Sequence, residues 1–208
     1  MNEIGILLAL LCGSVVVYAV WNLVKEASQL YTQQGPVFPF IAKHKEEQKT
    51  ETEKLQHNLS VGYSFERFIV SRFQKEYFTL HDWRSDKSHD GIYALSNLYP
   101  DLKYEFHHHA KHIFFAVECK WRKNFYNNGI ELKPEHIDNY IDYEQEENEK
   151  VFIAIGVRGT PAQPEFLFVF PLNDIDEDTT FLSRDFLNRY QKVPTSNFYF
   201  DPYRQKLS

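Results

Sequence analysis

The chain has 208 residues, which is enough for one domain of ordinary size and an additional segment. A net charge of −6 argues against a protein that coats nucleic acid through bulk positive charge, but it leaves room for a local basic cleft. The two cysteines, Cys12 and Cys119, lie in unrelated sequence contexts and do not resemble a disulfide framework, so we expect a reducing compartment.

An uncharged apolar run, Ile4–Val24, predicts a transmembrane anchor over residues 1–25. As a helix this run spans about 30 Å, which is the thickness of a bilayer core. A signal peptide and a buried helix are the alternatives, but the start lacks a basic n-region, and a buried helix is rarely apolar on every face. Because Lys25, Lys43 and Lys45 follow the run, the positive-inside rule predicts a single-pass protein of the cell membrane with a cytoplasmic C-terminal domain.

Residues 26–57 are predicted to form a polar linker. Gly35, Pro36 and Pro39 interrupt it early, and Lys43–His57 is rich in charge and poor in apolar side chains. Such a composition is typical of a solvated helix or a spacer. Its expected role is to hold the following domain away from the membrane.

The remaining residues, 58–208, predict one α/β domain. Phe65, Ile69 and Phe73 recur at helical spacing and indicate an opening helix. Aromatic and β-branched runs indicate strands, and a proline in the first turn marks a second helix. The predicted elements are a helix (Asn58–Tyr77), three strands (Tyr77–Arg84, Asp101–Phe106, Ile113–Trp121), a helix (Lys133–Asn148), two strands (Lys150–Val157, Glu165–Leu172) and a short helix around Phe181–Tyr190.

The third predicted strand, Ile113–Trp121, carries two opposite charges near its end, Glu118 and Lys120. Successive strand residues face opposite sides of a sheet, so these two side chains project from one face. The other face is apolar and suited to a core; it carries Ile113, Phe115, Val117, Cys119 and Trp121. The charges therefore lie on one face of a strand whose second face packs in the interior.

The preceding strand divides in the same way, and matching the two apolar faces sets the register of a hairpin. If Phe106 lies opposite Ile113, then Asp101 lies opposite Glu118, about 5 Å away on the same face. Opposed like charges are unfavourable unless a cation lies between them, and hard divalent ions bind carboxylate oxygens. A metal there can activate a phosphate, and Lys120 can hold the attacking water or offset transition-state charge. The alternative is an ordinary ion-pair cluster on a solvated face.

These residues resemble the PD-(D/E)xK phosphodiesterase superfamily. Its motif matches Pro100–Asp101 followed, at an ordinary hairpin distance, by Glu118–Lys120. A Gly-x-x-Phe-Glu-like pattern in the preceding helix matches Gly62–Glu66. The resemblance covers the middle of the chain and implies a restriction-endonuclease-like fold, which is an α-β-β-β-α-β core with a mixed central sheet.

The resemblance also implies a Mg²⁺-dependent nuclease, with Mn²⁺ as a substitute ion, that cuts DNA in preference to RNA. Asp101 and Glu118 look like metal ligands, joined by the backbone carbonyl of Cys119, and Lys120 looks like the catalytic lysine. Glu66 looks like an accessory ligand that acts directly or through water; the alternative is a solvent-facing helix glutamate. The side chain of Cys119 is expected to pack in the core rather than to react.

Arg122 and Lys123 follow the motif and are candidate contacts to the phosphate backbone of nucleic acid, although basic residues at strand ends are common. Two features favour a different function. The glutamates of residues 144–149 would repel phosphate if they faced the cleft, and a membrane anchor is unusual beside a DNA-cutting domain. The alternative prediction is a catalytically inactive protein of the nuclease fold that binds nucleic acid or serves as a scaffold at the membrane.

Three further segments are weaker candidates for a functional site. The segment His107–His112 falls in the predicted hairpin turn; histidines bind Zn²⁺ or Ni²⁺, but neighbours on a turn do not all converge on one ion, so a solvated turn is favoured. Asp90 is a second candidate for the motif aspartate, ranked behind Asp101. The segment Gly156–Gly159 follows a strand but lacks the helix and spacing of a phosphate-binding loop.

Overall fold

The structure is a computed structural model, and it describes residues 21–26, 39–84, 88–89, 92–93 and 98–208. Contacts within the chain divide it into two compact units, Met1–Lys54 and Leu55–Ser208. Residues 1–20, which contain most of the predicted anchor, lie outside the described residues, and residues 21–26 are helical. Within the described part of the chain, no helix is long and apolar enough to cross a membrane.

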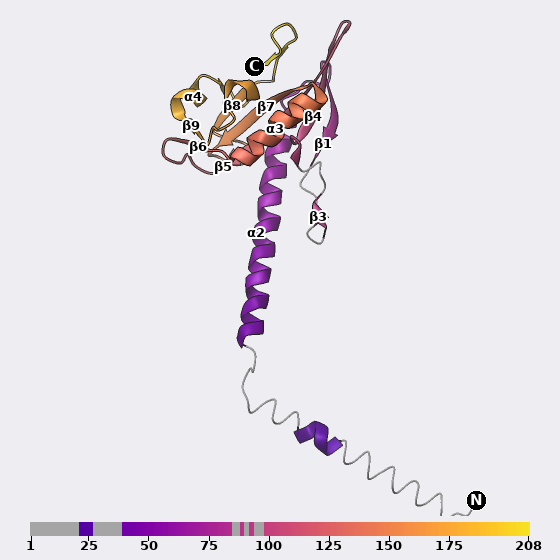
Figure 1. The fold of residues 1–208 in the computed structure, drawn as a ribbon, viewed down its shortest axis with the longest axis vertical. Coiled ribbons are helices and arrows are strands. Elements are labelled where there is room, and N and C mark those ends of the chain that lie inside the picture. The colour runs from indigo at the N-terminus through magenta and orange to yellow at the C-terminus, as the bar shows by residue number, and fades with distance from the viewer. Residues whose placement is uncertain (1–20, 27–38, 85–87, 90–91, 94–97) are drawn as a thin grey trace, which may run out of the picture. The chain divides into compact units, whose positions relative to one another are not determined.

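The second unit holds an α/β domain in which the C-terminal part of a long helix precedes the first strand and a shorter helix follows the central hairpin (Figure 1). The helices are α2 (Pro39–Val70), α3 (Pro134–Glu147) and α4 (Arg184–Asn188), with a short 3-10 helix at Leu172–Asp174. The strands are β1 (Phe78–Trp83), β2 (Ser88–His89), β3 (Ile92–Tyr93), β4 (Leu102–His108), β5 (Lys111–Arg122), β6 (Gly129–Glu131), β7 (Lys150–Val157), β8 (Phe166–Pro171), β9 (Phe181–Ser183), β10 (Gln191–Lys192), β11 (Phe200–Asp201) and β12 (Lys206–Leu207).

Six of these strands form one mixed sheet in the order β1-β4-β5-β7-β8-β10. Strands β5 and β7 are parallel, and the other neighbouring pairs of this sheet are antiparallel. A parallel pair needs a long crossover connection, and α3 lies in that connection. The predicted mixed sheet and the predicted order of helix, three strands, helix and two strands are confirmed.

The β4–β5 hairpin has the predicted register. Phe106 lies opposite Ile113. The ladder ends with Leu102 opposite Val117. The hairpin is longer than predicted at its turn, because the ladder also includes His107 opposite His112. The match follows from the period of two along each strand, since a slip of one residue would place apolar side chains opposite the polar face.

Helix α2 differs from the predicted helix Asn58–Tyr77 at both ends. It begins at Pro39, inside the segment predicted as a linker, and ends at Val70. The chain then leaves the helix through a tight turn in which Phe73 N donates to Val70 O. Phe73 is nevertheless buried, so its spacing from earlier apolar residues imitates a longer helix. No glycine or proline follows Val70 closely to mark the stop in the sequence.

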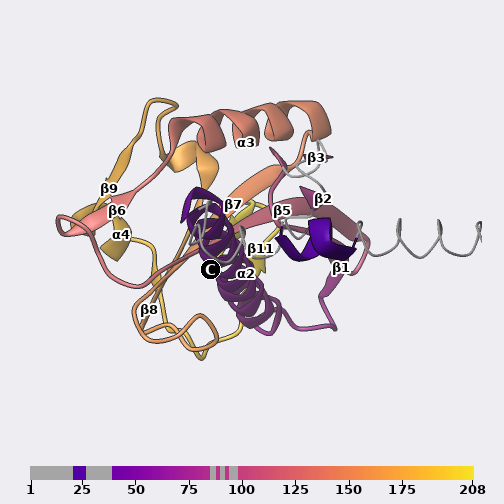
Figure 2. The same cartoon turned by 90° about the horizontal axis from the view of Figure 1, so that it is seen from below.

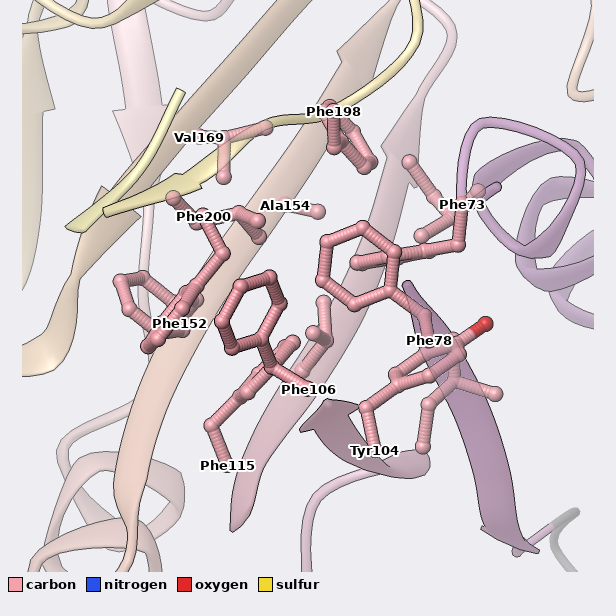
Figure 3. Packing of buried hydrophobic residues seen from close by; sticks show 14 of the residues in the cluster. Phe73, Phe78, Tyr104, Phe106, Phe115, Phe152, Ala154, Val169, Phe198 and Phe200 are labelled. Carbon is pink, nitrogen blue, oxygen red and sulfur yellow. The ribbon is translucent and has the colours of Figure 1, made fainter. Parts of the chain in front are cut away.

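One face of the sheet packs against α2 and the C-terminal segment. Figure 3 shows its centre, where aromatic rings from several strands meet around Phe115. The ring centroids of Phe115 and Phe200 lie 5.0 Å apart, and those of Phe73 and Tyr104 lie 4.0 Å apart. Each such pair stabilises a core by roughly 0.5–1.5 kcal/mol beyond its buried area. The apolar face predicted for Ile113–Trp121 therefore lies in the interior.

The opposite face of the sheet packs against α3, which runs along one side of the central strands in Figure 2. Ala116 of β5 is fully buried on this face. The buried residues of α3 are Ile137, Tyr140 and Tyr143. Glu118 and Lys120 follow Ala116 on the same face, so α3 is the helix that meets them.

Candidate active site

Asp101 lies immediately before β4, where the hairpin ladder has just ended. Its backbone carbonyl accepts a hydrogen bond from Arg84 N at 2.7 Å. Its carboxylate Oδ2 accepts one from Cys119 N at 2.8 Å. The side chain of Asp101 therefore continues the contact between the two strands by one residue, and its carboxylate interacts electrostatically with that of Glu118.

Glu118 and Lys120 form a buried ion pair on the face that meets α3. Lys120 Nζ donates to Glu118 Oε1 at 2.7 Å and to the hydroxyl of Tyr140 at 3.3 Å. Glu118 is only 6% exposed. A buried charge is costly unless it is paired, and this pair satisfies that condition. The ammonium group of Lys120 is thus held in place by one strand neighbour and one helix residue.

Glu66 reaches the site from α2, which packs on the other face of the sheet. It is 7% exposed, which rules out the solvent-facing alternative raised by the sequence. Trp83 Nε1 at the end of β1 donates a hydrogen bond to Glu66 Oε2. The Trp83 ring also stacks on Tyr63, one turn earlier in α2. The carboxylate of Glu66 is therefore fixed by the last residue of β1.

One cleft of about 430 Å³ collects these side chains, and we call it the carboxylate cleft. The predicted residues that line it are Glu66, Asp101, Glu118, Cys119, Lys120 and Arg122. Lys123 is exposed and is not among the lining residues. The structure thus brings together residues from α2, the start of β4 and the end of β5, whereas the second candidate, Asp90, lies outside the described residues.

The electrostatics of the cleft show an excess of negative charge. Burial, followed by the carboxylates of Glu118 and Glu66, raises the pKa of Asp101 well above its usual range. The Cys119 N–H and the Lys120 ammonium act in the opposite direction but do not overcome this effect. Neighbouring carboxylates that are short of positive charge are the expected surroundings of a divalent cation.

A coordination sphere is not preformed around this charge. Within the described residues, no group of three histidine, cysteine or carboxylate side chains is arranged to hold a metal ion. Glu118 is instead paired with Lys120, and Asp101 with the Cys119 N–H. The residues fit a divalent ion by their charge and oxygen donors, while their present hydrogen bonds are made within the protein.

The side chain of Cys119 packs against the hydrophobic core that lies between the sheet and α2. Burial, then the nearby carboxylates of Asp101 and Glu118, raises the pKa of the Cys119 thiol well above its usual range. Only the thiolate is a good nucleophile, so a thiol with this environment is inert at neutral pH. The backbone of Cys119 is the part that lies at the site.

The sequence did not identify several further residues that line the cleft, and these include Asn58, Tyr99, His136 and Tyr140. His136 lies in the first turn of α3, and its Nδ1 is 3.4 Å from the Tyr140 hydroxyl. Burial and the Lys120 ammonium lower the pKa of His136, so its ring is neutral at neutral pH. The spacing of four residues between His136 and Tyr140 places both on one helix face, which is the signal that was available in the sequence.

The acidic end of α3 does not line the cleft. Lys103 Nζ pairs with Glu147 at 3.1 Å and with Glu149 at 2.8 Å. Glu144 accepts a hydrogen bond from Val151 N at 2.7 Å, where β7 begins. These glutamates therefore have structural partners at the other end of α3, so the sequence-based concern about phosphate repulsion does not apply to this cleft.

The histidine segment forms the predicted turn, with His109 in a left-handed conformation at φ 54°. His112 Nδ1 lies 2.6 Å from Glu105 Oε1, and His81 Nε2 lies 2.7 Å from Glu105 Oε2.

The glycine at position 156 also has a structural explanation. A Cβ there would lie 2.4 Å from the Phe65 ring, so the glycine allows α2 to approach β7.

No protein-family model matches the sequence, and no curated protein matches it either. Among solved structures, the chain is similar to the Holliday junction resolvase Hjc of Archaeoglobus fulgidus, an archaeal hyperthermophile. The identity is 14%, the match covers 62% of this chain and 93% of that chain, and the TM-score is 0.44. A likeness of this size supports no functional conclusion, so the candidate function rests on the carboxylate cleft.

Proposed function

We propose that this protein is a metal-dependent nuclease that hydrolyses phosphodiester bonds in DNA, in preference to RNA. The observation that carries the proposal is the carboxylate cleft itself. Three carboxylates, those of Glu66, Asp101 and Glu118, lie with one lysine, Lys120, in a single cleft where negative charge is in excess. These residue types in that arrangement suit a divalent ion and a phosphate group.

Asp101, Glu118 and the backbone carbonyl of Cys119 would hold Mg²⁺ or Mn²⁺, with Glu66 as an accessory ligand. When bound, the ion supplies Lewis acidity to the phosphate and lowers the pKa of a bound water. The fixed position of Glu66, set by Trp83, favours this role because ligands held by a second layer of hydrogen bonds bind metal more tightly.

Lys120 would act on the substrate directly. Its ammonium group is held between Glu118 and Tyr140, so it can donate to an attacking water or to a phosphate oxygen without reorganising. Arg122 lines the cleft and is exposed, which suits a contact to the phosphate backbone. Lys123, one residue further, is exposed outside the lining and would contribute a more distant phosphate contact.

The test is cleavage of plasmid and linear DNA by the full-length chain with Mg²⁺ or Mn²⁺. We expect Glu118→Gln and Lys120→Met each to lower the cleavage rate by about 100-fold or more, and a chelator to abolish cleavage. The matched controls are Glu131→Gln and Lys75→Met, which change exposed residues away from the cleft. Cleavage that survives both cleft substitutions would contradict the site. DNA binding without metal binding or cleavage would instead favour a binding or scaffold protein.

We further propose that Ile4–Val24 anchors the chain in the cell membrane as a single span, with the domain in the cytoplasm. The support is the uncharged apolar run and the lysines that follow it. Carbonate extraction of cell membranes tests this proposal. The full-length chain should stay in the membrane pellet, whereas a chain in which Leu8 and Leu11 are replaced by arginine should be released. Release of the unchanged chain would contradict the anchor.

A further inference from the structure

A second hollow, of about 610 Å³, lies beside α2. The α2 residues that line it differ from the α2 residues that line the carboxylate cleft. The turn between β7 and β8 and the segment after β10 complete its wall. None of its described lining residues carries a carboxylate, although the chain as a whole is acidic. We call it the arginine groove; its polar lining residues are Ser64, Arg67, Ser71, Arg72, Gln163 and Thr195.

Arg67 gives the groove an exposed positive charge. Its Cζ atom lies 6.0 Å from the centroid of the Tyr63 ring, and it forms no ion pair with any residue in the described part of the chain. An arginine that stacks on an aromatic ring keeps its donors available, because the ring contacts the face of the guanidinium and not its edge.

Arg72 gives the groove a second positive charge in a fixed position. Its guanidinium donates to Thr195 O at 3.0 Å and to Ser71 Oγ at 3.1 Å and 3.2 Å. All of these acceptors are neutral, so they orient the group without cancelling its charge. A preoriented cation loses less entropy when it binds an anion than a mobile one does.

The chemistry of the two arginines favours phosphate as the ligand. Guanidinium groups bind phosphate oxygens through paired, charge-assisted hydrogen bonds. The hydroxyls of Ser64 and Ser71 already donate to Ser60 O and Phe68 O, so the two arginines are the charged donors of the groove. Because Arg67 and Arg72 both line the groove, each can meet a phosphate group of an extended polyanion.

The groove is connected to the carboxylate cleft through α2. Glu66 lines the cleft, and the next residue, Arg67, lines the groove. Trp83, which donates to Glu66, stacks on Tyr63 with ring centroids 5.1 Å apart, and Tyr63 in turn contacts Arg67. Tyr63 is 46% exposed, so its ring is accessible to a ligand at the surface of α2.

We infer that the arginine groove binds the phosphate backbone of the DNA strand that is cut in the carboxylate cleft. This inference rests on the proposed nuclease function. The groove supplies phosphate contacts on one side of the scissile bond, whereas the acidic cleft receives the scissile phosphate itself. It also explains how a chain of net negative charge can bind a polyanion, since the groove concentrates positive charge beside the site.

The experiment measures DNA binding separately from cleavage. Full-length protein carrying Glu118→Gln, which prevents cutting, is titrated into a fluorescein-labelled oligonucleotide, as a single strand and as a duplex, at several salt concentrations. Adding Arg67→Glu should raise the Kd about tenfold or more for the form that binds, and should reduce the slope of log K against log salt by about one. Arg67→Lys, which keeps the charge, should restore most of the affinity.

Two further variants keep the result interpretable. Arg189→Glu makes the same charge reversal at an exposed residue of the α4 end and should leave the Kd unchanged. Ser71→Asp places a carboxylate beside Arg72 and should weaken binding without touching Arg67. An unchanged Kd and salt slope in both Arg67→Glu and Ser71→Asp would overturn the inference.

The failure of this inference and the failure of the proposed function are distinguishable. If wild type cuts DNA and Glu118→Gln does not, but the arginine variants bind normally, the nuclease function stands and the groove is rejected. If wild type never cuts DNA, the nuclease function is rejected whatever the groove binds. If Glu118→Gln protein binds neither form of DNA, the groove is rejected as well.

Discussion

At the scale of single residues, the carboxylate cleft contains buried charges that destabilise one another and that together suit a divalent cation. Asp101, Glu118 and Glu66 repel one another, and that repulsion helps to raise the pKa of Asp101. Lys120 compensates part of the charge. The remaining negative charge is what a divalent ion would neutralise, so the same feature that is costly in the free protein favours metal binding.

Trp83→Phe tests whether the hydrogen bond to Glu66 matters for the metal. Phenylalanine can keep the stacking on Tyr63 but cannot donate to the carboxylate. We expect the Mg²⁺ concentration for half-maximal cleavage to rise about tenfold, with a smaller change in the rate at saturating Mg²⁺. A Mg²⁺ titration of the cleavage rate measures both quantities. An unchanged half-maximal concentration would contradict the role of this hydrogen bond in metal binding.

The grouping of the motif residues could be predicted from sequence because they lie on, or directly before, two strands whose pairing the pattern of side chains determines. Asp101 and Glu118 directly follow the end of the β4–β5 ladder and line one cleft, and Lys120 follows Glu118 two positions later on the same face. His136 and Tyr140 could not be identified in the same way. They reach the cleft because α3 packs across the sheet, and that packing depends on contacts between elements that are distant in sequence.

At the scale of elements, the position of α2 depends on close contact with β7. Gly156→Ala would place a Cβ 2.4 Å from the Phe65 ring, so either the ring or the helix must move. We expect the free energy of unfolding to fall by about 1–3 kcal/mol, and cleavage to weaken because Glu66 lies on the same helix. Urea denaturation followed by circular dichroism measures the change.

The matched control for this substitution is Gly62→Ala in α2. Its Cβ would lie 3.8 Å from Glu66 Oε1, which is an ordinary contact, so alanine fits. Because alanine is the better helix former, we expect stability to rise by about 0.5–1 kcal/mol. Equal effects of the two substitutions on stability would contradict the close approach of α2 to β7.

Glu105 of β4 links the three strands β1, β4 and β5 through its side chain, which contacts His81 of β1 and His112 of β5. Its carboxylate lies between His112 and His81, and hydrogen bonds from His112 and then His81 lower the pKa of Glu105 in the folded protein. A lowered folded pKa stabilises the protein above the usual glutamate pKa, and this contribution is lost as the pH falls through the folded value.

The melting temperature of Glu105→Gln tests this contribution. The variant should melt below wild type at pH 7, and the difference should shrink as the pH is lowered below the usual glutamate pKa, because wild type loses the same interaction by protonation. Glu76→Gln, at an exposed position in the turn after α2, should show no such pH-dependent difference. A gap that is constant from pH 7 to pH 3 would contradict the role of the charge.

The elements themselves were predictable to different degrees for physical reasons. The strand β7 and helix α3 match their predictions closely, because a continuous apolar run and a proline in the first turn mark them clearly. The predicted limits of α2 were wrong at both ends. Its start lies in a charged segment that the pattern describes only as solvated helix or spacer, and its end is set by a turn that buries Phe73 without a glycine or proline.

At the scale of the whole molecule, the proposed protein is a domain with two candidate binding surfaces beside one helix, preceded by a segment proposed as a membrane anchor. The carboxylate cleft and the arginine groove both use α2, so the helix that leads into the domain also helps to build its sites. The proposed DNA substrate is compatible with the acidic net charge, because the arginine groove and Arg122 supply local positive charge.

The central claim is that the carboxylate cleft is a metal-dependent nuclease site, and the most direct measurement compares two single aspartate changes. Cleavage of linear DNA by the full-length chain is followed across Mg²⁺ concentrations for wild type, Asp101→Asn and Asp142→Asn, the last at an exposed position of α3. We predict Mg²⁺-dependent cleavage by wild type and Asp142→Asn, and a rate at least about 100-fold lower for Asp101→Asn. Equal cleavage by all three proteins, or none by wild type at any Mg²⁺ or Mn²⁺ concentration, would contradict the account.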